Sequence, residues 1–437
     1  MTLEILANFI MYLSLLIVII FIMLLIKKYI YQKPWNNTYE VEAANTNLPS
    51  NDSGKTSLIS SLPELKKLGI LYFFNRVLLF TGVYLFVMVL ENRKYGLLES
   101  FKELWFKWDS NGYLRIAENW YSTVGDEKYD IALYPLYPIL IKAANNLINN
   151  YFLSGLFVSN IFLIIGLIFL YKLVKLEFGL EKTAFDSVKY LLIFPFSFFF
   201  SIVYTESVFF TLSVLTIYFI RKKSWYIGGV FGLLASFSRN QGLLLLVPVF
   251  IELIADIPWK EYFIKRNFKE IFRKLCRVIT VSLLIPCGIV LYLLINKLTY
   301  GDWFKFLSFQ KENWSQQFGF FANNIRGFVF NIANKDIRLG MGVFIPNLIV
   351  FFLCLILLII TIQKMRLSYI AYTILYVLVS FSPTWLLSGP RYISGMFTLY
   401  IMMAVSVKSD LSRKFAESIL CVFLILFAVL FTQNNVF

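Results

Sequence analysis

The sequence predicts an all-α polytopic membrane protein, and three features of its 437 residues indicate this class. Hydrophobic residues make up 59% of the chain and charged residues 15%, whereas a soluble domain is about half apolar and about a quarter charged. Several apolar runs approach the roughly 20 residues that a helix needs to cross a hydrocarbon core, and they lack the alternation of barrel strands. Lysines and arginines also gather in the short loops of one side, as they do in membrane proteins.

The apolar runs predict a bundle of about 11 to 13 transmembrane helices. The first run lacks a basic start and ends in Lys27 and Lys28, so we expect a retained span rather than a cleaved signal peptide. The expected spans lie near residues 5–26, 70–90, 152–175, 187–203, 206–220, 225–238, 242–255, 278–296, 343–363, 367–387, 391–407 and 415–432.

The basic residues predict how the chain is oriented. The loops at 221–223, 364–366 and 412–414 read RKK, KMR and SRK, and short loops rich in lysine and arginine stay on the cytoplasmic side. The N-terminus is then outside, and the net charge of +15 reflects topology and headgroup contact rather than nucleic-acid binding. The long segments are expected inside at 27–69 and 256–277, and outside at 91–150 and 297–342.

Three parts are expected along the chain. Residues 33–63 are rich in Asn, Ser and Pro, which is typical of a flexible linker. The division is an N-terminal transmembrane anchor at 1–32, a cytoplasmic linker at 33–69 and the main transmembrane domain at 70–437, which contains the candidate functional residues.

An amphipathic helix is predicted within the basic segment 256–277. Its apolar side chains fall on one helical face, which is typical of a helix lying in the membrane interface as an anchor, with partner docking as the alternative. The apolar face comprises Ile264, Phe268, Ile271, Phe272 and Leu275, and the opposite face Lys265, Arg266, Lys269 and Arg273.

The absence of histidine and the positions of the cysteines limit the reactions and metal sites that the chain can support. The chain has no histidine, which excludes Ser-His-Asp catalysis, most zinc sites and histidine proton relays. The cysteines lie in or beside apolar runs without CxxC spacing, so we expect packing residues rather than disulfides or metal ligands. They are Cys276, Cys287, Cys354 and Cys421. No cofactor and no divalent metal are therefore expected, and the acids of the first outside segment, Asp126, Glu127 and Asp130, are the weakest point of that expectation.

The stretch KWDSNGYLRIAENWY at 107–121 is polar although apolar spans flank it. Its apolar residues recur at helical spacing, which predicts a short helix in the outer interface with its aromatic face toward the membrane. Asp109 stands just before the first turn, where it can cap the helix by accepting backbone N–H bonds or serve as a general base aimed at a cavity. The apolar residues are Tyr113, Ile116, Ala117, Trp120 and Tyr121.

Three further charged residues stand at expected hairpin tips. Glu206 ends the connection YTE at 204–206, and Arg239 opens the connection RNQ at 239–241. Arg391 lies in SGPRYISG, between a proline and glycines. Acids near spans are costly and usually functional, although Glu206 can simply mark a hairpin end and the arginines can reach toward lipid headgroups.

Together these segments resemble the PIG-V-type mannosyltransferases, which add the second mannose to GPI anchors, and their prokaryotic relatives. The resemblance covers about residues 105–255 and returns at PRY, 390–392. Two positions depart from the family pattern, since Asn240 stands where many relatives have proline and Lys107 where many have arginine. The matching stretches are Trp108-Asp109 with Tyr113, Ile116-Ala117 and Tyr121; Tyr134-Pro135-Leu136-Tyr137-Pro138; Pro195 to Ser207; and Ser238-Arg239-Asn240-Gln241-Gly242.

The resemblance implies a GT-C-fold glycosyltransferase whose first large outside loop carries interfacial helices. Such enzymes take a sugar, usually mannose, from a polyprenyl-phosphate donor and invert the anomeric centre. The partners are then that donor, a glycolipid or glycan acceptor and membrane lipids, in the plasma membrane of a prokaryote or the endoplasmic reticulum of a eukaryote.

For this chain the resemblance implies Asp109 as general base and Glu206 as a second catalytic carboxylate that binds sugar hydroxyls or orients an arginine. Either Arg239 or Arg391 would hold the donor phosphate. Tyr134 and Tyr137 also fit an interfacial aromatic belt. The donor- and acceptor-binding candidates are Trp108, Tyr113, Tyr134, Tyr137, Tyr204, Arg239, Asn240, Arg391 and Tyr392.

Two other classes stay open. A transporter or lipid flippase would have inverted repeats and acids at mid-span depth, and the chain shows no repeat and has its acids at the ends of spans. A non-catalytic scaffold would not need Asp109 or Glu206.

Overall fold

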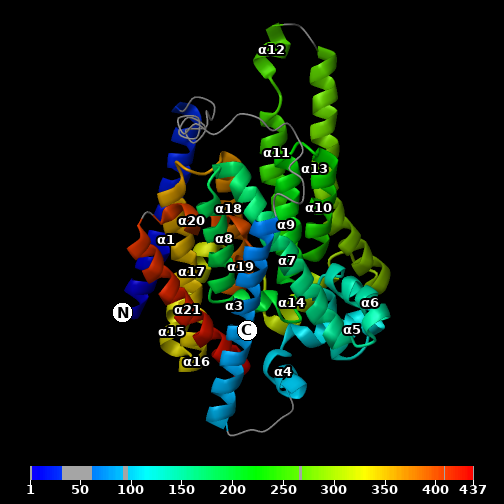
Figure 1. Cartoon of the computed structure of the whole chain (residues 1–437), viewed down its shortest axis with the longest axis vertical. Helices are drawn as coiled ribbons and strands as arrows, with labels where there is room; N and C mark the ends of the chain where they lie inside the picture. Colours follow the sequence, from blue (N-terminus) through cyan, green and yellow to red (C-terminus); the bar gives the residue numbers. More distant parts are fainter. Residues whose placement is uncertain (1, 32–61, 92–96, 265–267, 408, 437) are drawn as a thin grey trace.

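The computed structural model describes residues 2–31, 62–91, 97–264, 268–407 and 409–436, and their regular structure is helical (Figure 1). Six of the described helical segments are long and apolar enough to cross a membrane, or seven if one bent pair is counted as a span. The predicted class is therefore confirmed, and the chain is an integral multi-pass membrane protein. The six segments are α1 (Thr2–Tyr31), α3 (Leu62–Glu91), α7 (Tyr151–Phe178), α13 (Phe268–Tyr300), α16 (Ile337–Leu339) continued through η4 (Gly340–Phe344) and α17 (Ile345–Thr361), and α21 (Asp410–Thr432).

The other expected spans are shorter helices in the middle of the bundle. Almost every side chain of α9 is buried, so the irregular backbone before this helix is covered by protein rather than by lipid. They are α8 (Glu181–Ile193), α9 (Glu206–Arg221), α10 (Trp225–Ser238), η3 (Asn240–Leu245) with α11 (Leu246–Ala255), α18 (Leu367–Ser380), and α19 (Gly389–Ser394) with α20 (Phe397–Ser406).

Several expected spans are interrupted or shortened, and the one expected at 367–387 ends with α18 at Ser380. The span expected at 187–203 stops with α8 at Ile193, because the residue before Pro195 avoids the helical region, and a short 3-10 turn, η2 (Ser197–Phe200), follows. The span expected at 391–407 is divided between α19 and α20.

The segment at 97–150, which was expected outside and is called the first outside segment for that reason, forms the helix that was predicted, but protein covers it. Its helices are α4 (Leu97–Trp105), α5 (Asp109–Asn119), η1 (Asp126–Ala132) and α6 (Leu136–Ile148). In α5, Tyr113, Ile116 and Ala117 are buried, and the helix packs against α6 and α7. Trp120 ends the helix and stays 40% exposed. The apolar face of α5 therefore faces the bundle rather than lipid.

The second outside segment packs onto the first. It contains α14 (Lys305–Trp314) and α15 (Phe321–Asn334), and α14 lies against η1. The loop between α14 and α15 pairs with the loop after α18 through an isolated bridge between Phe318 and Pro383. Segments distant in sequence thus close over the same end of the bundle.

The prediction of an interfacial helix at 256–277 is wrong. Residues 259–264 form the short α12 (Trp259–Ile264), and residues 268–277 are the first turns of α13, because no helix breaker separates them from the following span. At 33 residues α13 is about 50 Å long, more than a hydrocarbon core of about 30 Å, so it extends beyond the membrane. Figure 1 shows α12 and the start of α13 at the end opposite α4 and α16. Lys265 and Arg266 lie outside the described residues.

Part of the segment predicted as a linker is helical. Residues 62–69 belong to α3, and Glu64 pairs with Lys175 of α7 at 2.8 Å. Residues 33–61 of the predicted linker lie outside the described residues.

Buried ion pairs hold the far end of α9. Arg221, its last residue, donates from Nε to Glu177 Oε1 at 2.5 Å and from Nη1 to Glu252 Oε2 at 2.9 Å. Arg366 donates to the other oxygen of Glu177 at 2.5 Å. Because α9 begins at Glu206, this cluster fixes the helix that carries Glu206.

Candidate active site

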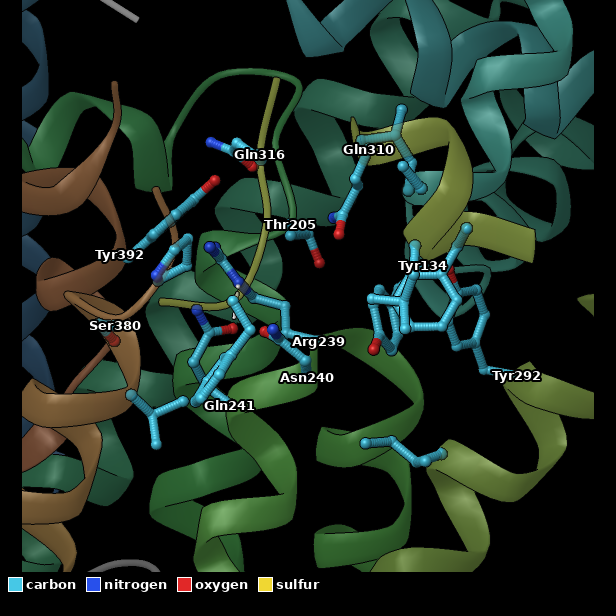
Figure 2. A pocket seen from close by; sticks show the side chains of 18 of the residues that line it. Tyr134, Thr205, Arg239, Asn240, Gln241, Tyr292, Gln310, Gln316, Ser380 and Tyr392 are labelled. Carbon is cyan, nitrogen blue, oxygen red and sulfur yellow. Dashed lines mark hydrogen bonds between the residues drawn. The ribbon is translucent and has the colours of Figure 1, made fainter. Parts of the chain in front are cut away.

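A cavity of about 640 Å³ opens between the two outside segments and the hairpin tips. This volume is typical of a site for a small molecule. Figure 2 shows polar side chains converging on it from several elements. Its walls come from the start of α5, residues 132–134, the tips at 205 and 238–241, the middle of α13, α14, the loop at 316–318, and residues 379–383 and 391–392.

Asp109 lines this cavity at the first residue of α5. Trp108 precedes it with a φ of +52°, a left-handed conformation that costs on the order of 1–3 kcal/mol in a non-glycine residue and is common at functional sites. The cap residue is Trp108, and it makes no side-chain cap bond. The Asp109 side chain is 29% exposed and accepts a hydrogen bond from Arg391 Nη1 at 2.6 Å. The geometry therefore presents the carboxylate to the cavity.

Glu206 lies behind the cavity wall and joins the two arginines. Its side chain is fully buried at the first residue of α9, where the helix dipole favours an acid. Its Oε1 accepts from Arg391 Nε at 2.5 Å and from Arg239 Nη1 at 2.6 Å. Asp109, Arg391, Glu206 and Arg239 thus form one continuous chain of ion pairs.

Both arginines line the cavity and are held from behind. The Arg391 guanidinium lies 4.4 Å from the Tyr204 ring centre, and the Arg239 guanidinium lies 5.1 Å from that of Tyr392. The Arg391 guanidinium also pairs with the Glu206 and Asp109 carboxylates, so contacts on several sides fix its position.

The predicted tyrosines divide into cavity and supporting residues. Tyr113, Tyr134 and Tyr392 line the cavity, as does Asn240. Tyr134 stacks on Tyr292 with ring centres 4.1 Å apart, so its ring packs against protein and the cavity rather than joining a lipid-facing belt.

The remaining candidates stand outside the lining. Tyr137 is fully buried, and its hydroxyl bonds to Gly155 O at 3.0 Å and to Ser159 Oγ at 2.7 Å. Tyr204 is also fully buried and donates to Lys107 O at 2.9 Å. Trp108 is 40% exposed beside Asp109 and does not line the cavity.

Several polar lining residues were not predicted. The amide-rich composition of residues 297–342 and the tip RNQ were the available signals, but neither showed that these side chains share one cavity. They are Thr205, Gln241, Tyr292, Gln310, Lys311, Gln316, Gln317 and Ser380.

The acids of the first outside segment are not grouped for metal binding. Arg115 holds Asp130 with two hydrogen bonds, of 2.8 and 2.7 Å. Within the described ranges no three His, Cys, Asp or Glu residues are close enough to hold an ion.

Fold and site together define a polytopic α-helical membrane protein with a charged cavity at one end of its bundle. No family model matches the chain, and no curated protein matches it. Among solved structures, ArnT from Cupriavidus metallidurans bound to undecaprenyl phosphate is similar at 14% identity and a TM-score of 0.47. The match covers 78% of this chain and 62% of that one.

Proposed function

We propose that this protein is a membrane glycosyltransferase of the GT-C type, which moves a hexose from a polyprenyl-phosphate donor to a lipid-linked or glycan acceptor. The observation that carries the proposal is one cavity wall on which an accessible carboxylate, Asp109, lies beside two fixed guanidinium groups, Arg239 and Arg391. A base and an anion-binding pair are the groups that transfer from a phosphate donor requires.

In this reaction the acceptor hydroxyl oxygen attacks the anomeric carbon from the face opposite the phosphate. The bond from that carbon to the phosphate oxygen breaks, and polyprenyl phosphate leaves with the electron pair. Attack from the face opposite the leaving group inverts the anomeric centre. The hydroxyl proton passes to Asp109, which balances the negative charge gained by the leaving phosphate.

The arginines stabilise the leaving phosphate. Arg239 and Arg391 are held by Glu206, so they need no rearrangement as negative charge develops, which is the basis of electrostatic preorganisation. Arg391 Nη1 bonds to Asp109 Oδ2, so the other carboxylate oxygen, Oδ1, is the one that accepts the hydroxyl proton. Glu206 then acts as the positioning residue for the arginines.

The sugar we propose is mannose, which rests on the resemblance of residues 105–255 to the PIG-V-type enzymes. The acceptor on that basis is a GPI-anchor-like glycolipid or a related glycan on the outer face of the membrane.

The test is reconstitution of the full chain with radiolabelled polyprenyl-phosphate mannose and a membrane lipid extract. We expect label to move into a glycolipid with the wild type and with Asp126→Asn, which alters an exposed loop acid away from the cavity lining. Label that stays on the donor, or moves equally with Asp109→Asn, contradicts the proposal.

A further inference from the structure

The cavity has two chemically different sides. Figure 2 shows Arg239, Asn240 and Gln241 on one side, with Tyr134, Tyr292 and Gln310 across from them and Thr205 between. The first side carries the cations that suit a phosphate. The second side combines an aromatic face with an amide. Neither the base nor the phosphate-binding arginines of the proposed transfer lie on this side.

The aromatic face on the second side is rigid. Tyr292 is fully buried, donates to Ile131 O at 2.7 Å, and stacks on Tyr134 at 4.1 Å. Tyr134 is half-buried and lies between Tyr292 and the cavity, so one ring is held flat against another. The apolar C–H face of a pyranose packs well on such a ring.

Gln310 is held in place on the same side. Its neighbour Phe309 is 5% exposed and contacts the rings of Tyr129 and Tyr300 at 5.3 and 5.4 Å, which fixes α14 against η1. Figure 2 shows the Gln310 carboxamide directed into the cavity between Thr205 and Tyr134. A carboxamide both donates and accepts, which matches the vicinal hydroxyls of a sugar.

Two polar groups on this side have no partner in the described part of the chain. The residue Thr205 is 2% exposed and its hydroxyl makes no hydrogen bond, and the half-buried Gln310 side chain bonds to no described residue. Covering these groups with a prenyl chain would leave them unsatisfied, at a cost of about 1–3 kcal/mol each. A hydroxylated ring supplies the missing partners.

We propose that Tyr134, Gln310 and Thr205 form the subsite for the pyranose ring of the acceptor, across the cavity from the phosphate-binding arginines. This inference rests on the proposed transferase function and names the class of acceptor group, a hexopyranose. The donor sugar is bonded directly to its phosphate and so occupies the arginine side, which leaves the aromatic side to the acceptor.

Sugar binding can be tested without knowing the acceptor. Saturation-transfer difference NMR with methyl α-D-mannopyranoside on the full chain in nanodiscs should show binding by the wild type. Gln310→Ala should weaken binding of the mannoside about fivefold, because one hydrogen bond is lost. Tyr134→Ala should weaken it at least as much, and Tyr134→Phe, which keeps the ring, should restore it.

The matched control is Asn323→Ala, which removes an exposed amide on α15 away from the cavity lining and should leave sugar binding unchanged. Polyprenyl phosphate binding is measured on every variant to separate the two proposals. Tyr134→Ala and Gln310→Ala should keep it, and Arg239→Gln should lose it.

The inference is overturned if the wild type does not bind the mannoside, if Asn323→Ala loses binding as Gln310→Ala does, or if Tyr134→Ala weakens polyprenyl phosphate instead of the sugar. Loss of phosphate binding by the wild type, with the sugar still bound at Tyr134, would contradict the transferase proposal and not this subsite.

Discussion

At the scale of single residues, the substitution Asp109→Asn distinguishes a structural role of this residue from a catalytic one. Asn is isosteric with Asp, and its side-chain oxygen can still accept the hydrogen bond from Arg391, but it cannot accept the proton. We expect Asp109→Asn to reduce turnover by about 100- to 10,000-fold at saturating polyprenyl-phosphate mannose, the usual cost of losing a general base.

Donor binding is the control for that variant. Arg391 keeps its bond to Glu206 when Asp109 is replaced, so the phosphate site should survive and the melting temperature should stay near the wild-type value. Near-normal turnover would assign Asp109 a structural role and make Glu206 the next candidate for the base.

Glu206 is expected to matter for stability as well as for activity. Glu206→Gln leaves Arg239 and Arg391 buried without the anion they share, and breaking a buried ion pair costs about 3–5 kcal/mol. Denaturant titration in mixed micelles measures this loss. The matched control is Glu312→Gln, whose partner is Lys128 in an exposed pair and which should change stability by less than about 1 kcal/mol. Equal effects for the two variants would refute the structural role given to Glu206.

At the scale of elements, close contact between α10 and α13 sets the position of Arg239. A Cβ on Gly288 would lie 2.1 Å from Leu233 O and 2.2 Å from Ser236 Oγ, and α10 ends one residue before Arg239. Gly288→Ala should therefore separate the helices, destabilise the protein by about 1–3 kcal/mol and raise the KM for the donor.

A second glycine provides the comparison. A Cβ on Gly327 of α15 meets no atom within 4 Å, so Gly327→Ala should be neutral or stabilising by up to about 1 kcal/mol. Melting temperatures of the two variants measured side by side test the contact, and a harmless Gly288→Ala would show that α10 and α13 are packed less closely.

At the scale of the whole molecule, the orientation in the membrane can be measured at two exposed positions. In a chain whose native cysteines are replaced, an impermeant maleimide should label Thr123→Cys on intact cells and Lys223→Cys only after permeabilisation. Thr123 lies in the first outside segment and Lys223 between α9 and α10, and both are exposed, whereas Ser110 is fully buried and would not report. The reverse pattern would place the cavity on the cytoplasmic side.

Although it predicted a continuous span over 187–203, where α8 ends at Ile193, the sequence by itself determined the membrane class, the short helix beside Asp109 and the short spans on either side of Arg239. Each of these depends on local information, namely apolar length, helical spacing and a polar tip between short spans. It misjudged 256–277 because an amphipathic pattern does not reveal that a helix continues into the next span.

Only the tertiary structure decided which of these residues share a site. Asp109 and Arg391 are 282 residues apart in the chain and 2.6 Å apart in space, and Glu206 joins Arg391 to Arg239. The tertiary structure also places Gln310 across the cavity from Arg239. It shows that Tyr137 and Tyr204 are buried and do not line the cavity. Periodicity shows which face of a helix is apolar, but the neighbour of that face depends on how all the helices pack together.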